Sequence, residues 1–91
     1  MKNKLDNFLN SERIVHTWPA KRSNQLLVLD HMAASFPRGR MFTEREVNER
    51  LNTLHTWGDP CHMRRELVDA GRLKRTEDGA SYWAADLPES E

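Results

Sequence analysis

Apolar residues recur at helical spacing in two stretches of the first half of the chain. Ser23 or Asn24 is placed to cap a helix that runs to about Ser35. Thr43 and Glu46 form a capping-box pattern at the start of a second helix. The inward stripes are Leu26, Leu29, Met32, Ala33 and Phe36 in the first helix, and Val47, Leu51 and Leu54 in the second.

A third helix is predicted to begin at residue 59 or 60. Gly58 interrupts the preceding pattern, Asp59 is a suitable N-cap, and Pro60 suits the first helical position because its missing N–H would have no partner there. Gly71 can end the helix in a left-handed conformation about three turns later. The inner face of this helix consists of Met63, Leu67 and Ala70.

Residues 73–77 and 80–84 flank an Asp-Gly pair, which is typical of a hairpin with a two-residue type I′ turn. This register places Arg75 opposite Tyr82 and Leu73 opposite Ala84, with Leu73 and Tyr82 on the core face. Two helices with a short turn between them, followed by a hairpin, are the order of a winged helix-turn-helix. The predicted fold is therefore α+β: a small winged helix-turn-helix domain with three main helices and a C-terminal β-hairpin wing.

The ends of the chain carry weaker patterns. Residues 1–22 are expected to form an N-terminal arm or short helix, in which Leu5, Phe8 and Leu9 have helical spacing. Residues 13–18 alternate and predict an edge strand or an extended arm, and Met41 with Phe42 predicts a brief extended piece. Residues 86–91 form an acidic tail that we expect to be frayed. Residues 1–91 are thus interpreted as a single domain.

Composition favours a soluble, folded protein. The chain has 91 residues, of which 37% are hydrophobic and 31% charged, so it is expected to form one domain with a small core. Its longest apolar run, residues 26–29, is far too short to span a membrane. Cys61 is the single cysteine and cannot form an internal disulfide, which favours a cytoplasmic location.

The charges balance but are unevenly distributed. Fourteen basic and fourteen acidic residues give a net charge of zero, which counts against strong DNA binding. Glu77 and Asp78 at the tip of the predicted wing would also repel phosphate. Net neutrality can nevertheless hide a basic face, because two clusters hold Lys21, Arg22, Arg64, Arg65, Arg72, Lys74 and Arg75.

Residues 13–83 resemble a bacterial family of domains of unknown function, with the signature T-E-x-E-V-N … R-R-x-L-V-D-x-G. The resemblance implies a winged-helix-like fold and an association with transcriptional regulators, and it implies no enzymatic activity. The residues that carry it are Phe42-Thr43-Glu44-Arg45-Glu46-Val47-Asn48 with Leu51, His55 and Asp59, Arg64-Arg65-Glu66-Leu67-Val68-Asp69-Ala70-Gly71 with Leu73 and Arg75, Asp78-Gly79, and Tyr82-Trp83.

The third predicted helix carries the candidate binding residues. Counted from Met63 at about 100° per residue, Arg65, Arg72 and Cys61 fall at roughly 200°, 180° and 160°, opposite the buried stripe. In a winged helix these outward positions would face base edges and phosphates, although a partner carboxylate or simple solvation would satisfy the two arginines equally well. The candidate DNA-binding residues are Arg65, Arg72, Lys74, Cys61 and His62.

Two other arginines are predicted to be structural. Arg64 falls at about 100°, on the flank of the apolar stripe, so we expect it to be partly buried and paired with Glu46 of the second helix. Arg75 could contact a nucleic-acid backbone, but a cation–π contact with Tyr82 is the preferred interpretation.

No catalytic residues, metal site or cofactor are predicted. The sequence has no nucleophile–base pattern, no phosphate-binding glycine loop and no paired carboxylates in an apolar setting. His31, His55, Cys61 and His62 match no zinc spacing, and we expect His55 to cap or pack at the end of the second helix.

Two functions follow from these observations. The first is a DNA-binding or transcription-regulatory accessory domain, with double-stranded DNA as its partner and a contact surface made of the third helix and the hairpin. The second is a protein-interaction or dimerisation module, joining a homodimer or a fused or separate regulator, for which exposed tryptophans among Trp18, Trp57 and Trp83 would be anchors.

Overall fold

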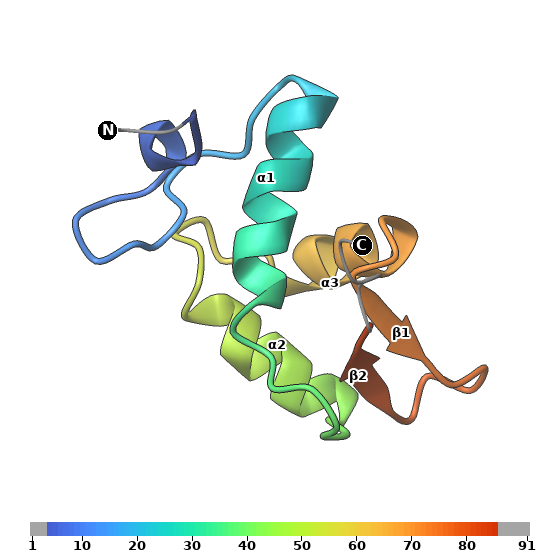
Figure 1. Ribbon diagram of the computed structural model, residues 1–91. Helices are drawn as coiled ribbons and strands as arrows, with labels where there is room; N and C mark the ends of the chain where they lie inside the picture. Colours follow the sequence, from blue (N-terminus) through green and yellow to red (C-terminus); the bar gives the residue numbers. More distant parts are fainter. Residues whose placement is uncertain (1–3, 86–91) are drawn as a thin grey trace.

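The computed structural model describes residues 4–85, and within them three α-helices are followed by a two-stranded antiparallel hairpin (Figure 1). Helix α3 contacts α1, α2 and β1, so it occupies the centre of the fold. The predicted small winged-helix-like α+β architecture is confirmed. The elements are the 3-10 helix η1 (Lys4–Phe8), α1 (Arg22–Ala33), α2 (Glu44–Asn52), α3 (Pro60–Asp69), β1 (Leu73–Arg75) and β2 (Tyr82–Ala84).

The starts of α2 and α3 lie where the local sequence predicts them. The Thr43 hydroxyl accepts a hydrogen bond from the Glu46 N–H at 3.1 Å, and the Glu46 carboxylate accepts one from the Thr43 N–H at 2.8 Å. At α3, the Asp59 carboxylate accepts from the His62 N–H at 3.2 Å, and Pro60 is the first helical residue. Each helix therefore begins with its own cap, without help from distant parts of the chain.

The Thr43 cap provides a first test of the fold. Replacing Thr43 by alanine should lower the free energy of unfolding by about 1 kcal/mol, because the Glu46 N–H loses the hydroxyl oxygen that accepts its hydrogen bond. Urea unfolding would measure the loss. Thr56→Ala is the matched control, because the Thr56 side chain is exposed and makes no hydrogen bond in the described part of the chain. Equal losses in the two variants would contradict the capping role.

The predicted cap of α1 is wrong. The helix begins at Arg22, its N-cap residue is Lys21, and no side chain caps it. Ser23 and Asn24 lie inside the first turn, where Asn24 N–H already donates to the Lys21 carbonyl at 3.0 Å. The Arg22 guanidinium at the start of the helix pairs instead with Glu66 of α3 at 2.8 Å.

The N-terminal segment packs against the helices and forms only short pieces of regular secondary structure in its described part. Its first part is the 3-10 helix η1 instead of the amphipathic helix predicted there. The extended-arm prediction for residues 13–18 is closer, because Val15 is fully buried and makes isolated β-bridges with Leu9 and His55. Figure 1 shows η1 and the hairpin on opposite sides of the helices.

The hairpin has the predicted register but a different turn. Leu73 pairs with Ala84 and Arg75 with Tyr82, as expected. The turn, however, runs over the four residues 77–80, with the Gly79 N–H donating to the Thr76 carbonyl at 3.0 Å. Gly79 has a φ of +73°, whereas Asp78 has no positive φ, so a type I′ turn is excluded.

The extended piece at residues 41 and 42 joins the hairpin as a third, very short strand. Phe42 forms an antiparallel bridge with Tyr82, in which each N–H donates to the other residue's carbonyl at 2.8 and 2.7 Å. This bridge ties the hairpin to the start of α2. The acidic tail predicted for residues 86–91 lies outside the described residues. Within residues 4–85, no helix has the length and apolar character that a membrane crossing requires.

Candidate nucleic-acid interface

A groove of about 570 Å³ separates α3 from the hairpin. Its walls come from the N-terminal half of α3, from β1 and the hairpin turn, and from the first residue of α2. Three guanidinium groups lie along it, those of Arg64, Arg65 and Arg75. The fold therefore gathers positive charge at one place on a chain whose net charge is zero.

Two of these arginines are available to a partner. Arg65 is exposed on α3, and Arg75 is exposed on β1. Neither guanidinium makes a hydrogen bond or an ion pair within residues 4–85. Arg75 does not lie over the Tyr82 ring as predicted. That cation–π position belongs to Arg64, whose Cζ is 5.9 Å from the ring centroid, while Arg75 extends along the hairpin toward Gly79.

Arg64 is partly buried as predicted, with 18% of its side chain exposed, but its predicted partner is wrong. Its Nη1 donates to the Asn48 side-chain oxygen of α2, and its Nη2 lies 3.9 Å from the Glu44 carboxylate. Glu46 is not paired with Arg64, and its carboxylate accepts the Thr43 N–H in the capping box. Arg64 thus joins α2, α3 and the hairpin and defines the floor of the groove.

Arg72 does not face outward from α3. The helix ends at Asp69, and Gly71, with a φ of +76°, redirects the chain, so the helical angle of Arg72 has no meaning. Its Nε donates to the Asp30 carboxylate of α1, and its Nη1 donates to the Ala70 carbonyl at 2.9 Å. Only 25% of the side chain is exposed, and it is not among the residues that line the groove.

The remaining predicted residues divide between two surfaces. Cys61 and His62 line the groove, although the His62 Nε2 also lies 3.3 Å from the Glu66 carboxylate and its ring packs edge-on against Trp18. Lys74 is exposed opposite Trp83, on the other face of the hairpin from Arg75. Of the five candidate residues, the groove therefore includes Arg65, Cys61 and His62 and excludes Arg72 and Lys74.

Two carboxylates limit the positive charge of the groove. Glu44 lies at one wall and Asp78 at the hairpin turn, so three guanidiniums face two formal negative charges. The hydrogen bond from the Thr76 hydroxyl, followed by that from the Ala80 N–H, holds the pKa of the Asp78 carboxyl below its usual range. Asp78 therefore stays ionised at neutral pH, and its charge opposes an anion that approaches the Arg75 end of the groove, where the Arg75 side chain extends toward Gly79.

The described residues contain no cluster of side chains suited to bind a metal ion. Within residues 4–85, no three His, Cys, Asp or Glu side chains gather into a group that could hold a metal ion. His55, which lies between α2 and α3, is buried and hydrogen-bonded to the backbone on both sides, as expected for a residue that packs at the end of α2.

A family model for an uncharacterized protein conserved in bacteria (DUF2087) matches residues 14–84. This range contains all three α-helices, the hairpin and every residue that lines the groove. No curated protein matches the chain. No solved structure matches it either.

Proposed function

We propose that this chain, which belongs to the bacterial DUF2087 family of uncharacterized proteins, is a non-enzymatic DNA-binding or transcription-regulatory accessory domain. Its contact surface is the groove between α3 and the hairpin. The observation that carries the proposal is the gathering of Arg64, Arg65 and Arg75 in that groove, on a chain without net positive charge.

The shape of the fold supports this use of the groove. In a winged helix the helix that precedes the hairpin enters the major groove of DNA, and the hairpin lies over the phosphate backbone. Arg65 on α3 and Arg75 on β1 would then contact the same duplex from two sides. Guanidinium groups suit this role because their fixed fork of N–H donors matches two phosphate oxygens at once.

Binding by the isolated chain is expected to be weak and strongly salt-dependent. Each neutralised phosphate contributes about −0.9 to the slope of log K against log salt concentration, so the two available arginines, Arg65 and Arg75, give a slope of about −1.8. Fluorescence anisotropy of a labelled duplex, titrated between about 20 and 200 mM salt, measures this slope. Binding that is absent at the lowest salt concentration would refute the proposal.

Arg65 provides the sharpest single test. Arg65→Gln should weaken DNA binding about tenfold near 50 mM salt and reduce the magnitude of the slope by about 1, because one phosphate contact is lost. Arg45→Gln is the control: it removes the same charge from the exposed face of α2, where Arg45 pairs with Glu49 at 3.1 Å. If both variants weaken binding equally, net charge governs the interaction and the groove has no special role.

One observation favours a second function, that of a protein-interaction module. Met41 is 55% exposed and lies with the half-buried Trp83 around a shallow hollow on the hairpin's outer side. Methionine and tryptophan are frequent at the centres of interfaces, so this hollow would accept an apolar side chain from a second copy or from a fused or separate regulator. A chain that does not bind DNA at low salt but self-associates would favour this function.

A further inference from the structure

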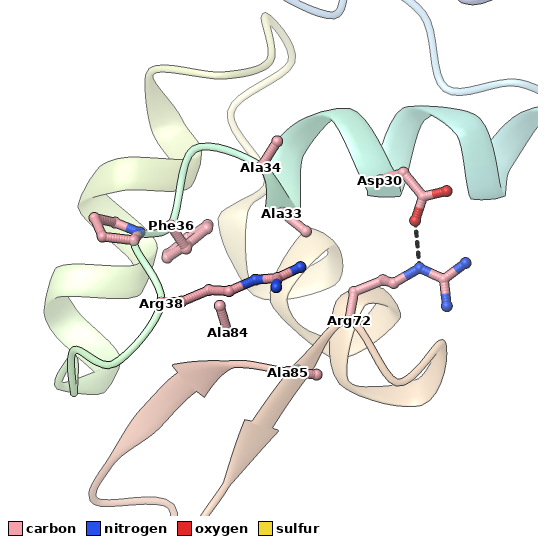
Figure 2. Close-up of a pocket in the computed structure, with 9 residues that line it drawn as sticks. Asp30, Ala33, Ala34, Phe36, Arg38, Arg72, Ala84 and Ala85 are labelled. Carbon is pink, nitrogen blue, oxygen red and sulfur yellow. Dashed lines mark hydrogen bonds and ion pairs between the residues drawn. The ribbon is translucent and has the colours of Figure 1, made fainter. Parts of the chain in front are cut away.

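A second cavity, of about 340 Å³, lies where the end of α1, the loop after it and the end of β2 meet (Figure 2). It shares no lining residue with the groove between α3 and the hairpin. Its volume is at the lower end of the range typical of small-molecule sites, about 300–1,000 Å³. The residues around it have chemistry that selects a class of ligand.

The cavity has more positive than negative charge. Arg38 and Arg72 both line it, and Asp30 is the one acidic residue among the described residues that line it. Arg72 uses that carboxylate, since its Nε donates to Asp30, as the dashed line in Figure 2 marks. Arg38 makes no hydrogen bond or ion pair within residues 4–85. Among the described residues that line the cavity, the positive charge of Arg38 therefore has no negative counterpart.

The Arg38 guanidinium is directed into the cavity. Figure 2 shows the Arg38 side chain crossing from the loop to lie below Ala33. The Arg38 side chain is exposed, and its guanidinium presents several N–H donors in one plane, which match the two oxygens of a carboxylate. The side chain that is free to bind an anion thus already points at the space the anion would fill.

The rest of the cavity wall is apolar. Phe36 is almost fully buried beneath it, and Ala84 and Ala85 at the end of β2 are nearly as buried. Ala33 adds a methyl group from α1. These side chains offer no hydrogen-bonding groups, so the part of a ligand that lies against them must be apolar and compact.

We propose that this cavity binds a small organic monoanion, in which a carboxylate contacts Arg38 and a compact apolar group packs against Phe36, Ala33 and Ala84. The proposal does not depend on DNA binding, because the two sites share no residue. The cavity lies at the base of the hairpin, where the Ala85 N–H donates to the Arg72 carbonyl at 3.1 Å.

Benzoate is a suitable probe because it combines a carboxylate with a compact apolar ring, and benzamide is its neutral counterpart of equal shape. In two-dimensional ¹H–¹⁵N spectra of the full chain, benzoate should shift the amide signals of residues 33–36, 38, 84 and 85. It should bind about tenfold more tightly than benzamide, the expected contribution of a charge-assisted hydrogen-bonded pair. Arg38→Gln should weaken benzoate binding by a similar factor, and the matched control Arg45→Gln, on the exposed face of α2, should leave it unchanged.

Four outcomes would overturn the proposal. Equal affinity for benzoate and benzamide would remove the role of the charge. Equal affinity for benzoate and inorganic phosphate would remove the role of the apolar wall. Shifts confined to the residues that line the α3–hairpin groove, or benzoate binding that survives Arg38→Gln, would show that the anion binds elsewhere. The dispersion of the spectra verifies that each variant is folded.

Discussion

Replacing His55 by alanine should lower the free energy of unfolding by about 3 kcal/mol, because a buried ring and both of its hydrogen bonds to the backbone are lost at once. His55 is only 3% exposed. Its Nε2 accepts a hydrogen bond from the Asp59 N–H at 2.9 Å, so the neutral ring carries its proton on Nδ1, which donates to the Leu51 carbonyl at 2.7 Å. The ring also packs edge-on against Trp57, with centroids 4.6 Å apart.

The loss is expected because His55 joins the end of α2 to the start of α3. Without the ring, the Asp59 N–H loses its acceptor and the Leu51 carbonyl retains the Leu54 N–H alone of its two donors, while the cavity left behind adds to the cost. Urea unfolding measures the change, with His16→Ala as the control, since His16 is exposed and contacts only the neighbouring Thr17 side chain. A loss below about 1 kcal/mol for His55→Ala would mean that water replaces both partners and that the ring does not hold the turn.

The features that sequence predicted well are those that depend on near neighbours. Thr43 with Glu46, and Asp59 with Pro60, fix the starts of α2 and α3 within a single helical turn, so no knowledge of the rest of the fold is needed. The hairpin register likewise follows from alternation about Asp78-Gly79. By contrast, α1 begins at Arg22 without a side-chain cap. Arg22 pairs with Glu66, which is 44 residues away along the chain, and no local pattern encodes this contact.

The candidate site was harder to predict because it depends on which partner each charge takes. Glu46 fits both a capping box and a pairing with Arg64. In the structure its carboxylate accepts the nearby Thr43 N–H, and Arg64 contacts Asn48 and Glu44 instead. The outward position predicted for Arg72 assumes that the helix continues to residue 72, whereas α3 ends at Asp69. Arg75 was assigned to Tyr82 from cross-strand pairing alone, whereas Arg64, from α3, occupies the ring face.

Phe42 connects the two halves of the fold, and its loss should have the largest effect on stability. Phe42→Ala should lower the free energy of unfolding by about 4 kcal/mol, the usual cost of removing a buried phenyl ring. The ring is 2% exposed and packs edge-on against Phe36, with centroids 5.3 Å apart. Arg40 and Arg50 lie over it, at 4.7 and 5.3 Å from its centroid. The backbone of the same residue pairs with Tyr82.

Because the Phe42 backbone bridges to the hairpin while its ring lies in the core, the variant should loosen the hairpin before the helices. Hydrogen exchange would report this as faster exchange at the Tyr82 amide than at amides within α2. Met41→Ala is the matched control: Met41 is adjacent in the same extended segment but 55% exposed, so its loss should change stability by less than about 0.5 kcal/mol. Uniformly faster exchange through hairpin and helices would instead mean that Phe42 stabilises the domain as one cooperative unit, and the hairpin would then have no independent motion with which to adjust to a DNA backbone or a bound anion.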